Sequence, residues 1–185
     1  MRDGLPPYLR LGDLGQHPSS GFLEAKFGPV PVEDASTGLR NTRLLKGDSM
    51  TNIPKPTDAA NPLDSAFVQR YDSEDVRAYA DLYADAARLI NSKALEAFDL
   101  TKETDLVRQA YGGDGFGQGV LLARRLVEGG AQFVEVDLGG WDTHTENHRG
   151  VESRASVLDR TLATLLGHLE ERGLLQTSLV AVVTE

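Results

Sequence analysis

The sequence predicts an α/β fold in which a sheet containing parallel strands is flanked by helices. Three segments in the last third of the chain support this prediction: an alternating segment at residues 131–138, an amphipathic segment at residues 151–172 and an apolar run at residues 178–184. The order strand, long helix, buried strand is typical of a βαβ unit, whose strands run parallel and are joined by a right-handed crossover.

Each of these segments has its own periodicity. The amphipathic segment has apolar residues at intervals of three and four from Val151 to Leu169, as on one face of a helix, and Gly173 is its stop signal. Residues 178–184 are almost continuously apolar, as in a strand buried on both faces. The alternating segment has the two-residue period of a strand. Its two faces would carry different side chains: Phe133, Glu135 and Asp137 on one, and Val134, Val136 and Leu138 on the other.

The middle of the chain predicts further helices. Ser73 can cap a helix over residues 74–90, Ser92 a short one over residues 93–98, and Thr101 a third over residues 102–111. A fourth helix is expected over residues 116–128, where two consecutive glycines, Gly129 and Gly130, provide the stop signal.

Residues 1–70 contain most of the prolines and no sustained period, so we expect an irregular segment that wraps a neighbouring body. Residues 27–32 are the candidates for short edge strands in it. Because a buried strand is a poor natural terminus, the end of the chain at Glu185 predicts an internal piece of a larger protein. The whole chain is therefore expected to be a single incomplete domain, irregular at 1–70, helical at 72–128 and βαβ at 131–185.

Composition excludes several classes of function. The formal net charge of −9 argues against nucleic acid or an anionic membrane surface as the main partner. The absence of cysteine excludes disulfides, thiolate zinc sites and a cysteine nucleophile. No apolar run approaches the roughly 20 residues that a transmembrane helix needs. With 185 residues, of which 40% are hydrophobic, the chain can still bury a core.

The residues that could bind a metal ion or take part in catalysis follow the first predicted strand. In an open parallel sheet, ligands bind beyond the carboxyl ends of the strands. Asp142 and His144 lie beyond one such end, and Glu185 lies at the same end of the second predicted strand. Carboxylate and imidazole ligands suit Zn²⁺, Mn²⁺, Mg²⁺ or Ca²⁺. The three residues are therefore candidate ligands of a divalent metal ion whose identity the pattern leaves open.

Each candidate also has a structural interpretation. An Asp before a helix commonly forms a turn or a cap, and a single loop His is commonly only exposed, so spacing alone supports both interpretations of Asp142 and His144 equally. For Glu146 and His148 we favour the structural interpretation, in which they cap or flank the helix. His168, among leucines, is expected to be a partly buried structural residue.

Two other kinds of site, a phosphate-binding loop and a nucleophile elbow, are excluded because the sequence lacks their motifs. The glycine-rich residues 113–119 lack the spacing, the preceding strand and the Lys of a phosphate-binding loop. No nucleophile-elbow motif, Gly-x-Ser-x-Gly, occurs in the chain. The sequence thus leaves the catalytic residues unknown.

Several stretches of the chain resemble the bacterial DUF1501 proteins. The resemblance is strongest where residues 121–136 run into Gly140-Trp141-Asp142-Thr143-His144, and it extends to Asn147. It covers nearly the whole chain, because further matching stretches lie at residues 5–8, 21–23, 97–100, 173–175 and 179–185.

The DUF1501 family is similar in fold to alkaline phosphatases and sulfatases. The resemblance therefore implies an incomplete alkaline-phosphatase-like domain from a metal-dependent hydrolase that acts on phosphate or sulfate esters of small molecules or polysaccharides. By this analogy Asp142 and His144 would be metal ligands and Glu185 would begin a second ligand or anion-binding element.

The same resemblance bears on activity and location. Family members have an N-terminal part, where the nucleophile would lie, and a continuation past Glu185, so this fragment is expected to be inactive. The intact parent is expected to be periplasmic or exported. The alternative is a non-catalytic exported protein that retains the fold for binding or structural purposes.

Overall fold

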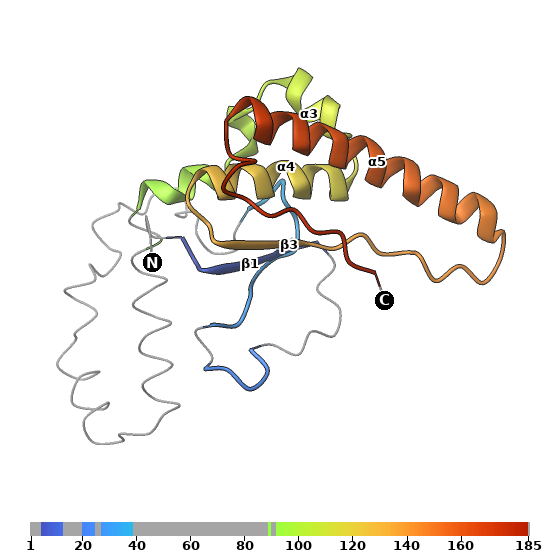
Figure 1. Cartoon of the computed structure of the whole chain (residues 1–185), viewed down its shortest axis with the longest axis horizontal. Helices are drawn as coiled ribbons and strands as arrows, with labels where there is room; N and C mark the ends of the chain where they lie inside the picture. The colour runs from blue at the N-terminus through green and yellow to red at the C-terminus, as the bar shows by residue number, and fades with distance from the viewer. Residues whose placement is uncertain (1–4, 13–19, 25–26, 39–88, 90–91, 185) are drawn as a thin grey trace, which may run out of the picture.

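The computed structural model describes residues 5–12, 20–24, 27–38, 89 and 92–184, and it has a mixed α/β architecture (Figure 1). Three short strands, β1 (Tyr8–Leu11), β2 (Val30–Val32) and β3 (Phe133–Val136), form a parallel sheet in the order β2-β1-β3. The helical elements are η3 (Lys93–Phe98), η4 (Leu100–Lys102), α3 (Asp105–Tyr111), α4 (Gly115–Glu128) and α5 (Asn147–Glu171). The predicted α/β class with parallel strands is confirmed.

The helices lie on one side of the sheet (Figure 1). α4 packs directly on β3, while α3 and α5 pack on α4 and on each other. The core forms between the sheet and α4, where Leu9 and Leu11 of β1 and Leu121 and Leu126 of α4 are almost completely buried. Val136 of β3 packs against the same cluster. Removing this apolar surface from water is the main force holding the two layers together.

The N-terminal segment is not uniformly irregular, contrary to our expectation. β1 is the middle strand of the sheet, and it pairs in register from Tyr8 opposite Phe133 to Leu11 opposite Val136. Val30–Val32 lies inside the stretch predicted to contain edge strands. It forms the edge strand β2, which pairs with β1 on the side away from β3. The predicted helix at residues 74–90 and most of the predicted irregular segment lie outside the described residues, apart from Leu89, which is helical.

Most helix boundaries follow local capping. Ser92 caps η3 as predicted, with its side chain accepting from the backbone N–H of Ala94. The predicted cap at Thr101 is wrong, because the Thr101 hydroxyl donates to the Asp99 carboxylate. Thr104 caps α3 instead, so that helix begins later than expected. α4 and α5 agree with their predicted helices to within a few residues.

The predicted strand at residues 178–184 is not found. The segment has no regular secondary structure, and Leu179 and Val183 are 93% and 89% exposed. β3 therefore pairs with β1 rather than with the segment after α5. An apolar run predicts burial but cannot specify the strand that receives it, and α5 packs on α3 and α4 rather than on the sheet.

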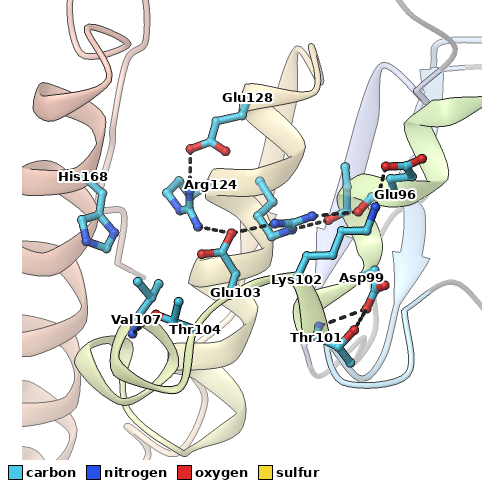
Figure 2. Close-up of polar contacts among 12 residues, drawn as sticks. Glu96, Asp99, Thr101, Lys102, Glu103, Thr104, Val107, Arg124, Glu128 and His168 are labelled. Atoms are coloured by element: carbon cyan, nitrogen blue, oxygen red, sulfur yellow. Dashed lines mark hydrogen bonds and ion pairs between the residues drawn. The ribbon is translucent and has the colours of Figure 1, made fainter.

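A network of ion pairs joins the turn between η4 and α3 to α4 (Figure 2). Glu103 lies 2.7 Å from Nη2 of Arg124 and 2.6 Å from Nη1 of Arg125. The Arg124 side chain, which is 1% exposed, also contacts Glu128 at 2.5 Å. Burial raises the pKa of Glu103, but the hydrogen bonds from Arg125 and Arg124 outweigh it and hold that pKa below its usual value.

Candidate metal site

The candidate site starts from the polar face of the sheet. Side chains alternate along a strand, so the face opposite α4 carries Tyr8 and Arg10 from β1 and Glu135 from β3. Arg10 Nη2 lies 2.6 Å from Oδ2 of Asp137, one residue past β3, and Arg10 Nε lies 3.4 Å from Glu135. This charged contact fixes the point at which the chain leaves β3.

Tyr8 lies on the same polar face of the sheet as Arg10 and Glu135. Its hydroxyl donates to Glu135, and burial, followed by this hydrogen bond, raises the pKa of Tyr8 to about 12. Its ring also packs edge-to-face on Phe133, with 4.8 Å between the ring centroids. Tyr8 is therefore a hydrogen-bond donor that links β1 to Glu135 of β3.

The loop from Asp137 to Glu146 carries the candidate ligands beyond the sheet to the start of α5 (Figure 1). Two close approaches hold it against α5. Gly140, at φ +84°, leaves no room for a Cβ beside the Arg154 guanidinium, and Gly150 is in a similar position against Thr143. The Thr143 hydroxyl also donates to the Asn147 side chain at 2.5 Å. The loop is therefore anchored at both of its ends.

Asp142 and His144 lie next to each other in this loop. Oδ1 of Asp142 and Nδ1 of His144 are 3.4 Å apart, and the two side chains are 91% and 82% exposed. Two ligands of a tetrahedral zinc ion, each about 2.1 Å from the metal, lie about 3.4 Å apart. The pair therefore has the donor types and the spacing of one edge of a metal coordination shell.

A third ligand is not found among the described residues. No group of three or more His, Cys, Asp or Glu side chains in the described part of the chain is arranged to hold a metal ion. Glu185, the third predicted ligand, lies outside the described residues. The structure thus brings Asp142 and His144 together and leaves the assignment of Glu185 as a prediction.

The remaining candidates, Glu146, His148 and His168, lie within α5 or at its start. Glu146 is the N-cap residue of α5 in a left-handed conformation and pairs with Arg149 at 3.1 Å, while His148 lies in the first turn of the helix. His168 is half-buried, with Nδ1 3.1 Å from the Tyr111 hydroxyl. Both observations agree with the structural interpretation of these residues.

Sequence reasoning missed the polar row at the sheet. Arg10 lies in a four-residue strand without a distinctive pattern, and Asp137 was noted only as one member of an alternation. The available signal was that alternation itself. It places Glu135 and Asp137 on one face of a largely apolar strand, where two carboxylates require a cationic partner.

Comparisons with known proteins give one match. A family model described as "Protein of unknown function (DUF1501)" matches residues 1–185. The comparisons with curated proteins and with solved structures found no match. Within the described residues, no helix combines the length and the apolar character needed to cross a membrane.

Proposed function

The chain belongs to the DUF1501 family, and on that premise we propose that Asp142 and His144 bind a divalent cation in a metal-dependent hydrolase of phosphate or sulfate esters. The domain would then be alkaline-phosphatase-like, with Glu185 as a further ligand. The observation that carries the proposal is the 3.4 Å separation of Asp142 Oδ1 and His144 Nδ1, which suits two ligands of one ion.

The position of the pair supports a role in ligand binding. The loop leaves the carboxyl end of a parallel strand, where α/β sheets commonly bind ligands. It is anchored by the Arg10–Asp137 contact at one end and by the contacts of Thr143 with Asn147 and Gly150 at the α5 end. Such anchoring reduces the entropy lost when both side chains are fixed on an ion.

The chemistry follows from the donor set. Oxygen and imidazole ligands suit Zn²⁺ or Mn²⁺ best, with Mg²⁺ and Ca²⁺ as further candidates. A bound cation would stabilise the negative charge that develops on an ester oxygen during hydrolysis. In this scheme, Asp142 and His144 hold the cation, and the high exposure of both side chains leaves the rest of its coordination shell open to an ester oxygen.

Calorimetric titration with ZnCl₂ and with MnCl₂ tests the ligand assignment. We expect the wild-type chain to bind one ion and expect Asp142→Ala and His144→Ala each to weaken binding by more than about 10-fold. His148→Ala, which removes a nearby imidazole on α5, is the matched control and should bind as the wild type does. Unchanged affinity in both ligand variants would remove the assignment.

Hydrolysis is a separate measurement, and it is made on the intact parent protein that the family resemblance implies. Metal-dependent turnover of p-nitrophenyl phosphate or p-nitrophenyl sulfate that is lost in Asp142→Ala would extend the proposal from metal binding to catalysis. The strong exposure of the pair favours a second candidate function, a non-catalytic protein that keeps the fold and holds a structural ion. Metal binding without turnover of either ester would agree with this second candidate.

A further inference from the structure

The side chain of Arg154, in the second turn of α5, lies against the loop of the candidate site. A Cβ on Gly140 would lie 2.7 Å from its Nη2 and 2.9 Å from its Nε. One turn earlier on the same helix, a Cβ on Gly150 would lie 2.6 Å from Cγ2 of Thr143. The chain reverses direction between the loop and α5 (Figure 1), so the loop runs alongside the first two turns of the helix. Asp142 lies between these two contacts in the chain.

Arg154 lacks the carboxylate partner that the other arginines have. Among the described residues, every other arginine pairs with an Asp or Glu side chain. On α5 itself, Arg149 pairs with Glu146 and Arg160 pairs with Asp114. The residues one helical turn from Arg154 are uncharged: Gly150, Val151, Val157 and Leu158. In a chain with a formal net charge of −9, this exposed guanidinium is thus available for an anion from outside the chain.

A guanidinium at this position suits a tetrahedral oxyanion. It is planar, it keeps its positive charge near neutral pH, and its N–H groups match two oxygens of a sulfate or phosphate group. Gly140 and Asp142 are two residues apart, so their Cα atoms lie at most about 7 Å from each other. This spacing is short enough for one oxyanion to lie between Arg154 and a cation held by Asp142.

From these observations we propose that Arg154 is the anion-binding residue of the candidate site and holds the sulfate or phosphate group of an ester beside Asp142. The substrate class rests on the proposed function, whereas binding of the anion by Arg154 requires no metal ion. In the loaded site, Arg154 holds the oxyanion from one side and the cation on Asp142 and His144 contacts it from the other. Arg154 thereby selects anionic esters over neutral ones, which have no charge to pair with it.

Fluorescence of Trp141 provides the readout for a test. Trp141 is the only tryptophan of the chain, directly precedes Asp142 and is 42% exposed, so its emission reports on an anion that binds at the loop. Sodium sulfate and, separately, sodium phosphate are titrated into the metal-free chain in EDTA. Sodium chloride is adjusted to keep the ionic strength constant, because salt screens exposed charges. The anion that binds more tightly identifies the ester group.

The variants assign the binding to one residue. We expect Arg154→Gln to weaken binding of the preferred anion at least about fivefold, because the charge-assisted hydrogen bonds are lost. Arg154→Lys keeps the charge without the planar donors and should have an intermediate affinity. Arg149→Gln is the matched control, since it removes an arginine of the same helix that pairs with Glu146, and it should change the affinity by less than about twofold.

Asp142→Ala separates this proposal from the metal proposal. In EDTA this variant should bind sulfate at least as tightly as the wild type does, because only a carboxylate has been removed. With ZnCl₂ in place of EDTA, sulfate binding should tighten in the wild type and not in Asp142→Ala. If zinc has no effect on the wild type, the metal assignment fails, while dependence on Arg154 in EDTA still supports the anion site. Equal affinities of the wild type and Arg154→Gln, no saturable binding by the wild type, or a fluorescence change that sodium chloride alone reproduces would overturn the proposal.

Discussion

Arg10 on β1 reaches across the sheet to Asp137, with 2.6 Å between Nη2 and Oδ2, and its side chain is 11% exposed. This contact joins the middle strand to the first residue of the loop that carries Asp142 and His144. The same guanidinium lies 3.4 Å from Glu135, so one buried cation balances two carboxylates. The sheet and the loop of the candidate site therefore share this electrostatic anchor.

Replacement of this anchor should destabilise the fold. In Arg10→Met, Glu135 and Asp137 would remain close together and partly buried without their cation, and we expect the free energy of unfolding to fall by about 2 kcal/mol. Urea denaturation followed by circular dichroism measures this loss. The control is Arg149→Met, which breaks a surface pair whose side chains are 83% and 69% exposed and should change stability by less than about 0.5 kcal/mol. Similar losses in the two variants would contradict the anchor role.

The Glu103 network predicts a dependence of stability on pH. The pKa of Glu103 lies below the ordinary value of a glutamate, because hydrogen bonds from Arg125 and Arg124 outweigh the effect of burial. The unfolded chain therefore binds a proton more readily than the native chain. Stability from this group is complete above the unfolded pKa and is lost as the pH falls through the native pKa. Unfolding free energies at pH 6 and pH 3 should differ less in Glu103→Gln than in the wild type.

The matched control for this pH experiment is Glu96→Gln. Glu96 also pairs with a cation, Lys102, but the two side chains are 62% and 45% exposed. Solvent and salt screen such a pair, so its removal should change the pH dependence much less than Glu103→Gln does. If Glu96→Gln flattens the profile as strongly, the buried network is not its source.

The close contact between α3 and α4 makes one glycine irreplaceable. A Cβ on Gly117 would overlap the backbone carbonyl oxygen of Tyr111, and neither backbone can move without disturbing the core. We expect Gly117→Ala to cost about 2 kcal/mol or more in thermal denaturation. Gly115→Ala, in the same helix with nothing within 4 Å, should be neutral or stabilising by up to about 1 kcal/mol. Comparable losses at both positions would show that the packing is looser than the structure indicates.

Elements specified by local signals could be predicted from the sequence. η3 with its Ser92 cap, α4 before its two glycines and α5 before Gly173 all depend on residues within a few positions of one another. β1 could not be predicted in this way. Its four residues carry little periodicity, and its pairing with β3 joins residues more than 120 positions apart. The pairing is a long-range packing effect that no short window contains.

The same distinction applies to the candidate site. Asp142 and His144 are separated by one residue, so their proximity follows from the chain itself. The Arg10–Asp137 contact spans 127 positions and could not be inferred from the pattern around either residue. The strand predicted at residues 178–184 failed for the opposite reason: its local pattern is strong, but the described structure gives it no partner.

One of the polar contacts that attach α5 to α3 is a buried hydroxyl. Thr161 is fully buried, and its Oγ1 donates to the backbone carbonyl of Tyr111 at 3.0 Å, near the end of α3. Thr161→Val keeps the shape of the side chain but leaves that carbonyl without this donor, so we expect a loss of about 1–2 kcal/mol in urea denaturation. Ser156→Ala is the control, because its hydroxyl donates to Glu152 within an exposed turn of the same helix. The control should change stability by less than about 0.5 kcal/mol. A Thr161→Val protein as stable as the wild type would show that the Thr161 hydrogen bond does not stabilise the packing of α5 on α3.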